Sequence, residues 1–494
     1  MISATNSYDA VPYPGFAYPN MHPDSLAAMA ILHGLFPAPV EHCRVLEVAC
    51  GDGANLIPMA YAIPGSEFIG FDMAGQPIER GQARIRQLGL TNIRLFQGNV
   101  LEVGKELGMF DYLIAHGLYS WIPASVRDRL LGLCRELLAP EGIAVVSYNA
   151  LPGGYVRQIA REVMFAGVGS VEDVGEKVGT GIRFLHDVLE TRLQNDPFRS
   201  LLEEHVNSMK NRRPEAVFHD ELSEVNDPVL FSDFIEHART HNLQYLSEVV
   251  LPPPPDPCYR ADLRPAIEGV GDGGVIAQEQ VLDFMRMRKY RETLLCHSER
   301  RVRRNFSGNV FRRLLFASPA EPAPCEAGNA KSFVLPGGIK METAHAGTVA
   351  LMDQLTAAWP HVLSWAQIEP MVSEDFSLDD NGVALLTRLA ISKMIDVHAW
   401  RAPVAAKLSA LPRATASVLH DARNGTHVTT LLHTTVRLDD PVVRGLLLLL
   451  DGTRDRAALF AALRVEFPDM PQNELEQGIE PNLRMFYRAG MLED

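Results

Sequence analysis

Apolar and polar positions over the first 150 residues follow the pattern of a parallel sheet with intervening helices. Short apolar runs, which predict buried strands, alternate with longer stretches in which apolar residues recur at helical spacing. Strands that alternate with helices favour a doubly wound α/β fold. The predicted strands are 44–49, 67–72, 93–98, 110–116 and 141–148, and the predicted helices are 26–36, 54–62, 76–88 and 125–138.

The rest of the chain changes character several times. Helical stretches with polar breaks predict an insertion, and the apolar run 293–296 then predicts the final strand of the sheet. A stretch rich in Pro, Ala and Gly predicts a linker, and helices followed by short strands suggest winged-helix-like modules. We therefore expect a core over 1–152, a helical insertion over 153–215, the remainder of the sheet domain over 216–305, a linker over 306–342, and two modules over 343–410 and 411–494.

The segment Glu47–Gly53 covers the end of the first predicted strand and the small, glycine-rich turn that follows it. Small residues at Ala49, Gly51 and Gly53 let the backbone approach a ligand where a Cβ atom would collide. Asp72 ends the second predicted strand, where its carboxylate can accept hydrogen bonds from both hydroxyls of a ribose. This layout indicates a site for a nucleoside-containing cofactor.

The spacing around this turn favours S-adenosylmethionine over a dinucleotide. The turn lacks the third glycine of a dinucleotide site, and Glu47 would repel a pyrophosphate. S-adenosylmethionine carries no phosphate, and its ammonium and sulfonium groups tolerate a carboxylate. The third apolar run ends at Gly98-Asn99-Val100. In class I methyltransferases, which this pattern resembles, that segment contacts the adenine, and Asn99 stands where an aspartate is usual.

Residues outside the turn complete the predicted cofactor site. Tyr8 and Tyr13 lie in a proline-broken N-terminal segment that we expect to fold over the cofactor as a lid. His116 follows the fourth predicted strand and is assigned to the cofactor through its backbone or ring. The full set of predicted cofactor residues is Tyr8, Tyr13, Glu47, Ala49, Gly51, Gly53, Asp72, Met73, Gly98, Asn99, Val100 and His116.

The loop after the fourth predicted strand is the expected place for the methyl acceptor, since ligands bind beyond the carboxyl ends of parallel strands. We predict that Tyr119 and Trp121 line a channel for an amine, using their ring faces to hold a cationic nitrogen. Tyr148 and Asn149, at the end of the fifth strand, are expected to face the same opening. The alternative for each aromatic residue is packing in the core.

Several longer segments resemble one family of bacterial methyltransferases, those with a methyltransferase regulatory domain. The segments are Tyr8–Tyr13, His22–Leu26, Asp111–Pro123, Ser147–Gly153, Phe218–Asp220 and Thr293–Cys296. The resemblance implies a Rossmann-like class I methyltransferase sheet, with mainly α winged-helix-like modules behind it, and S-adenosylmethionine as cofactor. The best-known relatives methylate lysines of bacterial, rickettsial-type outer-membrane proteins, so it also implies a protein substrate. A small-molecule acceptor is the alternative, and a non-catalytic scaffold is a third hypothesis.

Composition narrows the remaining choices. A net charge of −15 argues against nucleic-acid binding. The six cysteines form no Cys-x-x-Cys pair, so we expect reduced thiols and no metal. No apolar run is long enough to span a membrane, and the first residues lack the cationic and apolar parts of a signal peptide. These features predict a cytoplasmic protein; they leave its oligomeric state open.

Overall fold

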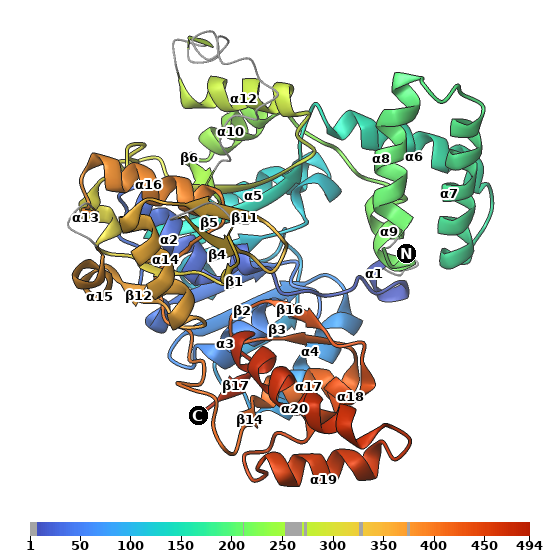
Figure 1. Ribbon diagram of the computed structural model, residues 1–494. Coiled ribbons are helices and arrows are strands. Elements are labelled where there is room, and N and C mark those ends of the chain that lie inside the picture. The colour runs from blue at the N-terminus through green and yellow to red at the C-terminus, as the bar shows by residue number, and fades with distance from the viewer. Residues whose placement is uncertain (1–6, 211, 252–268, 271–273, 326–329, 373–375) are drawn as a thin grey trace.

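A seven-stranded sheet forms the centre of the N-terminal half of the molecule (Figure 1). The computed structural model describes residues 7–210, 212–251, 269–270, 274–325, 330–372 and 376–494. The strand order is β3-β2-β1-β4-β5-β7-β6. All the strands predicted before residue 150 are confirmed. The bounds are β1 Arg44–Val48, β2 Glu67–Asp72, β3 Ile93–Gln97, β4 Phe110–Ala115, β5 Leu138–Asn149, β6 Leu243–Glu248 and β7 Tyr290–His297.

The sheet is parallel from β3 to β5 and antiparallel beyond. Val45 of β1 pairs with Phe68 of β2 and with Tyr112 of β4, both in parallel register. Strand β7 lies between β5 and β6 and runs antiparallel to both. The run 293–296 thus lies in the last strand of this sheet in chain order, although that strand sits inside the sheet rather than at its edge. The carboxyl ends of the parallel strands share one edge, which is where α/β proteins bind ligands.

Helices cover both faces of the sheet because successive strand residues point to opposite faces. Val45 joins the core beneath α2, α3 and α4, whereas Leu46 and Val48 join the core beneath α5 and α10. The helix expected at 26–36 begins and ends earlier. The bounds are α2 Pro23–Leu32, α3 Leu56–Ala62, α4 Gly75–Leu88, α5 Ala124–Leu137, α10 Phe231–Thr240 and, packed against α10, α12 Val275–Arg286.

A separate group of helices follows β5 and stands to one side of the sheet in Figure 1. These helices share a core of their own, with Met164, Leu185, Leu202 and Val217 among its residues. The short helix α1 Ser7–Ala10 lies beside α9 in the same view. The group continues past residue 215, where the sequence placed its end. The bounds are α6 Gly154–Val168, α7 Val174–Glu190, α8 Pro197–Lys210 and α9 Pro214–Glu221.

The stretch 306–342 differs from the expected linker because most of it is folded. Its Pro, Ala and Gly content suggested an open chain, but Leu314, Phe316 and Phe333 are fully buried. Strand β8 pairs with β12 and β13, and β9, β10 and β11 form a second small sheet. The bounds are α13 Gly308–Phe311, β8 Leu315–Ala317, β9 Glu321–Ala323, β10 Lys331–Val334, β11 Lys340–Thr343, α14 Ala346–Ala358, β12 Leu363–Ser364, α15 Trp365–Ile368, α16 Asp380–Ile391 and β13 Asp396–His398.

The last module has its own apolar core and contacts the sheet domain directly. Arg84 of α4 forms an ion pair with Asp421 of α17 at 2.8 Å. The described residues contain no helix with the length and apolar character that crossing a membrane requires. The bounds are β14 Arg413–Ala414, α17 Ala416–Asn424, β15 His427–Thr429, β16 Thr435–Arg437, α18 Pro441–Leu448, α19 Arg456–Glu466, α20 Gln472–Arg488 and β17 Leu492–Glu493.

Candidate active site

The turn after β1 has the backbone conformation that its small residues suggest. Ala49, Gly51 and Gly53 have φ angles of 58°, 56° and 72°, in the left-handed region that favours glycine. A Cβ atom at Gly51 would meet no atom within 4 Å, whereas one at Gly53 would lie 2.7 Å from Leu95. Gly51 therefore faces open space, and Gly53 is required by packing.

Asp72 lies at the end of β2, directly beside this turn. Its carboxylate accepts hydrogen bonds from the backbone N–H groups of Gly51, at 2.9 Å, and Ala74, at 2.8 Å. Burial raises the pKa of Asp72 above its ordinary value. Each carboxylate oxygen has two acceptor positions, so both can still accept from a ribose hydroxyl. Asp72 thus supports the turn and keeps free acceptor capacity, and its contact with a ribose stays a prediction.

Glu47 is the second carboxylate at this edge, and it is only 5% exposed. Asn55 donates a hydrogen bond to its Oε1 atom at 2.8 Å, but its Oε2 atom is buried without a hydrogen-bond partner in the described structure. Burial raises the pKa of Glu47 to about 8. A buried, unpaired acceptor is costly unless a ligand satisfies it. The ammonium group of S-adenosylmethionine would do so, and the residues present therefore fit that cofactor.

The end of β3 completes this edge of the sheet. Met73 is 57% exposed beside Asp72, while Val100 is buried in the core. The side-chain oxygen of Asn99 accepts a hydrogen bond from the N–H of Leu101 at 3.0 Å, which closes a local turn. Gly98 donates its N–H to the carbonyl of Asp72 at 2.9 Å. These contacts place Gly98 and Asn99 next to Asp72; their contact with adenine stays a prediction.

The N-terminal segment crosses from the helical insertion to the glycine turn. The ring of Tyr8 stacks on His219 at 4.0 Å, and that imidazole bonds to the carbonyl of Val11 at 2.7 Å. Tyr13 lies against the same imidazole at 5.9 Å, and burial raises its pKa to about 12. A Cβ atom at Gly15 would come within 2.5 Å of Ala54, just past the turn. The course of the N-terminal segment supports a lid, and its closure over the cofactor stays a prediction.

His116, after β4, belongs to a cluster that the sequence did not reveal, and its assignment to the cofactor stays a prediction. Its Nε2 atom lies 3.2 Å from a carboxylate oxygen of Glu292 and 3.1 Å from the hydroxyl of Tyr290, both on β7. The ring of Tyr18 lies 4.1 Å from the imidazole, and Asn20 donates to Glu292 at 3.4 Å. The polar residues just before the apolar run 293–296 were the signal in the sequence, but only the fold brings them to β4.

Tyr119 and Tyr148 occupy positions that match the core-packing alternative rather than a channel. Tyr119 is 3% exposed and Tyr148 is fully buried. The ring of Phe234 lies edge-on to Tyr119 and stacked on Tyr148. The Tyr148 hydroxyl lies 3.0 Å from the hydroxyl of Thr293. The prediction that these rings line an amine channel is therefore corrected: apolar contact with α10 covers both ring systems.

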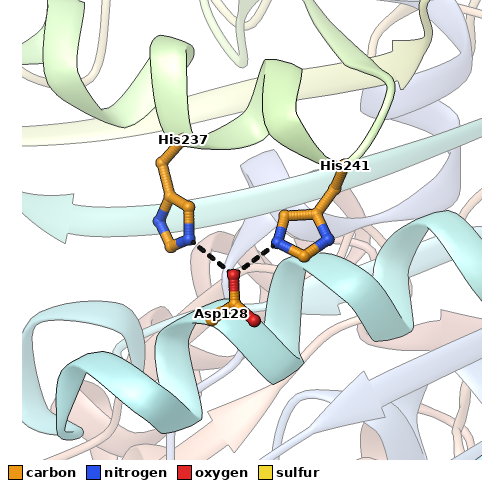
Figure 2. Close-up of side chains that lie close together, drawn as sticks. All are labelled: Asp128, His237 and His241. Atoms are coloured by element: carbon orange, nitrogen blue, oxygen red, sulfur yellow. Dashed lines mark hydrogen bonds and ion pairs between the residues drawn. The ribbon is translucent and has the colours of Figure 1, made fainter.

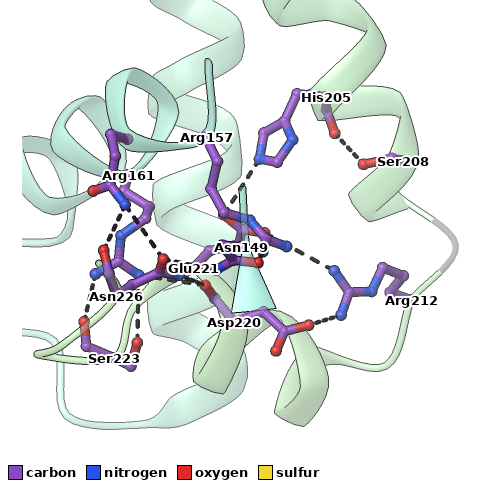
Figure 3. Close-up of polar contacts among 11 residues, drawn as sticks. Asn149, Arg157, Arg161, His205, Ser208, Arg212, Asp220, Glu221, Ser223 and Asn226 are labelled. Carbon is purple, nitrogen blue, oxygen red and sulfur yellow. Dashed lines mark hydrogen bonds and ion pairs between the residues drawn. The ribbon is translucent and has the colours of Figure 1, made fainter. Parts of the chain in front are cut away.

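Asn149 and Trp121 differ in how much of each is accessible. Asn149 is 1% exposed and lies inside the polar network of Figure 3, where it accepts from Arg157 at 3.1 Å and donates to Asn226 at 2.9 Å. The prediction that Asn149 faces the opening for the methyl acceptor is thus corrected: Asn149 links β5 to the helical insertion. Trp121 is half-buried at the end of a short 3-10 helix, Tyr119–Trp121, and its role stays a prediction.

The C-terminal module also contributes to the site. His433 lies 2.9 Å from the side-chain oxygen of Asn55, the residue that holds Glu47. A cavity of about 1060 Å³ opens beside it, lined by residues of α2 and of the C-terminal half, including His22, Trp400, His433 and Arg488. No local pattern around His433 pointed to this contact, since the two partners are far apart in sequence.

Three family models match parts of the chain. A methyltransferase domain matches residues 45–142, which hold the glycine turn and Asp72. A predicted methyltransferase regulatory domain matches residues 213–297, and a PKMT C-terminal winged helix domain matches residues 411–469. The last match falls within the second predicted C-terminal module.

Two relatives from Rickettsia prowazekii are similar in sequence. The uncharacterized protein RP028 is 35% identical over 244 residues, which are 48% of this chain and 97% of that protein. The uncharacterized protein RP789 is 31% identical over 315 residues, which are 62% of this chain and 56% of that protein. The chain therefore spans little more than half the length of the larger relative.

The fold is also that of a solved structure, PKMT2 from Rickettsia typhi in complex with AdoHcy. The two are 22% identical, and the alignment covers 97% of this chain and 100% of PKMT2 with a TM-score of 0.87. Together, the family models and the match to nearly all of RP028 identify the family, and the shared fold agrees with it. The chain belongs to the S-adenosylmethionine-dependent methyltransferases that carry a methyltransferase regulatory domain and a PKMT-type winged helix domain.

Proposed function

We propose that this protein transfers methyl groups from S-adenosylmethionine to lysine side chains of another protein in the cytoplasm. The observation that carries the proposal is the fold shared with PKMT2, a protein lysine methyltransferase by name, over 97% of the chain. The winged helix match supports it from an independent region of sequence. AdoHcy, bound in that structure, is the product that the donor leaves after methyl transfer.

The residues at the strand ends take distinct roles towards the cofactor. When bound, S-adenosylmethionine supplies a methyl group on a positively charged sulfur. Glu47 holds the ammonium group through its unpaired oxygen, and Asp72 accepts from the ribose hydroxyls. The N-terminal segment, fixed at Tyr8 by His219, excludes water from this edge.

The acceptor side is formed by the cluster around His116. A lysine attacks only as the neutral amine, because the protonated form has no free electron pair. Glu292 and Tyr290 offer oxygen acceptors that orient the amine N–H groups, and His116 fixes both side chains. The half-buried ring of Trp121 provides an apolar wall. Positioning within van der Waals reach of the methyl carbon then supplies most of the rate gain.

A macromolecular acceptor fits the structure better than a metabolite. A small acceptor requires only the edge of the sheet, whereas here the C-terminal half reaches the cofactor turn through His433 and frames a large cavity. Such a surface can hold a segment of protein chain while one lysine enters the site. A small molecule is the alternative acceptor, and the experiment below separates the two.

The test incubates the purified protein with methyl-labelled S-adenosylmethionine and a cell extract, then separates protein, nucleic acid and small molecules. We expect label in protein, recovered as methyl-lysine after acid hydrolysis. The matched control is Glu47→Gln, which keeps the size of the side chain and removes its charge; we expect little label with it. Label confined to small molecules or to nucleic acid would contradict the proposal, and label in no fraction would support a scaffold.

A further inference from the structure

Asp128, His237 and His241 converge on one point between two helices (Figure 2). Asp128 lies on α5, while His237 lies on α10 and His241 directly follows it. The spacing of four residues places both imidazoles on the same side of α10. The Nε2 atoms of His237 and His241 lie 3.3 Å and 2.8 Å from the Oδ1 atom of Asp128.

These distances suit coordination of a metal ion. The three ligand atoms all lie within 4.8 Å of one another. Two ligands bound at tetrahedral zinc, each about 2.0–2.1 Å from the ion, are about 3.3 Å apart. The pair His237–Asp128 already has this separation, and the pair His241–Asp128 requires a small outward shift of the carboxylate. Two imidazoles and a carboxylate are ligands that Zn²⁺ and its transition-metal neighbours prefer.

His237 also has the outer contact typical of a metal ligand. The hydroxyl of Tyr119 lies 2.8 Å from its Nδ1 atom, and Tyr119 is itself buried. Histidines that bind metals usually donate the other ring N–H to an acceptor, which fixes the ring and the tautomer. With an ion bound, Nδ1–H would donate to the tyrosine oxygen, and Nε2 would give up its contact with Asp128 and offer its electron pair to the ion.

Space and access are consistent with an ion entering from solvent. The side chain of Asp128 is 63% exposed, and those of His237 and His241 are 26% and 20% exposed. Gly132, one turn after Asp128 on α5, lies against the second imidazole: a Cβ atom there would be in ordinary contact with the Nδ1 atom of His241, at 3.5 Å. The carboxylate is thus free to adjust while the imidazoles are held.

We propose that Asp128, His237 and His241 form a binding site for a divalent transition-metal ion, with Zn²⁺ as the best-fitting ion and water at the open position. Helix α5 falls within the methyltransferase match at 45–142, and α10 within the regulatory match at 213–297. The ion would therefore link the two regions, and the contact of Tyr119 with His237 would connect this link to the loop after β4. The inference stands apart from the proposed lysine methylation, since it concerns only these side chains.

The test titrates Zn²⁺ into the full chain after removal of metals with a chelator, using calorimetry and thermal melting. We expect one ion per chain with a Kd of about 1 μM or tighter, and a melting temperature that rises with Zn²⁺. His241→Gln and Asp128→Asn should each weaken binding by at least about tenfold and abolish the rise in melting temperature. Both residues are partly exposed, so the variants are expected to fold.

The matched control is His186→Gln, because His186 is another helical histidine facing a carboxylate, that of Glu190 at 3.9 Å, with no third ligand among the described residues. It should bind Zn²⁺ like the wild type. If the wild type has no site that binds Zn²⁺ with a Kd of about 1 μM or tighter, the proposal is overturned. So would equal Zn²⁺ affinity in the wild type, His241→Gln and Asp128→Asn, since that result marks an adventitious ion.

Discussion

The Nε2 atom of His433 lies 2.9 Å from the side-chain oxygen of Asn55, although 378 positions separate them in the chain. The same oxygen accepts the backbone N–H of Tyr18 at 3.0 Å, and the Asn55 amide donates to Glu47 at 2.8 Å. One amide therefore joins the N-terminal segment, the C-terminal module and the buried carboxylate of Glu47. The C-terminal module therefore contacts the predicted cofactor site directly.

His433→Ala should weaken cofactor binding without removing any group that touches the cofactor. Loss of the imidazole frees Asn55 to rotate, and a buried hydrogen bond of this kind contributes about 1–3 kcal/mol, so we expect about a tenfold rise in Kd. Calorimetric titration with AdoHcy measures it. The control is His420→Ala, which removes a contact of the same module to Gln87 that is remote from Glu47. Equal affinities in both variants would contradict the role of His433.

Glu47 should make cofactor affinity depend on pH. Its pKa is raised to about 8 by burial, so the free protein holds it largely protonated below that pH, whereas an ammonium partner binds the carboxylate. Affinity should therefore rise with pH between about 6 and about 7.5, by up to about tenfold per unit. Calorimetry across this range tests it. Glu47→Gln should bind more weakly and show a flat profile; an equally steep profile would exclude Glu47 as the cause.

The N-terminal segment should contribute to cofactor retention through His219. His219→Ala removes the stacking partner of Tyr8 and the hydrogen bond to Val11, so the segment loses its anchor. We expect a rise in cofactor Kd of about fivefold, equivalent to about 1 kcal/mol, with little change in melting temperature. Deletion of residues 1–19 should weaken binding at least as much. A deletion variant that binds like the wild type would exclude a lid.

Trp121→Ala should reduce turnover more than cofactor binding, because the ring is proposed to wall the acceptor side rather than the cofactor. We expect kcat to fall by about tenfold or more while the Kd for AdoHcy changes by less than about twofold. Trp121→Phe keeps a ring face and should restore part of the rate. Unchanged turnover in the alanine variant would assign Trp121 to packing alone.

Two buried histidines should make the protein less stable in acid. Burial lowers the pKa of His22 and of His33 to about 4 each, whereas in the unfolded chain both titrate near 6.5. The unfolded state therefore binds more protons between these values, so stability is full above about pH 6.5 and falls by about 3 kcal/mol per residue towards pH 4.

Denaturant unfolding at several pH values measures this loss. His33→Gln removes one titrating group and keeps a donor for the carbonyl of Arg303, which His33 contacts at 2.8 Å. Its stability should depend less steeply on pH. A variant with the same steep profile as the wild type would show that other groups cause the acid sensitivity.

The sequence was most informative about the site where the residues concerned follow one another closely along the chain. The turn at Ala49–Gly53 and the carboxylate of Asp72 come at the ends of consecutive strands, so the sequence could predict that they lie side by side at one edge of the sheet. Tyr119 and Tyr148 illustrate the limit. An aromatic residue at a strand end serves a ligand or a core equally well, and only the position of α10 decides between them.

Contacts between distant parts of the chain could not be predicted from one sequence. The cluster of His116, Tyr290 and Glu292 depends on β7 returning near β4, and the contact of His433 with Asn55 depends on how the last module docks. Composition also misled at 306–342, because Pro and Gly did not prevent Phe316 and Phe333 from being buried.

The order of strands has a consequence for how the polypeptide is made. Strand β7 inserts between β5 and β6, so the edge of β5 stays unpaired until residue 297 has left the ribosome, after the whole helical insertion has been synthesised. An unpaired strand edge invites pairing with other chains. Nascent chains of this protein thus pass through a long interval in which shielding by chaperones or by the insertion itself decides between folding and aggregation.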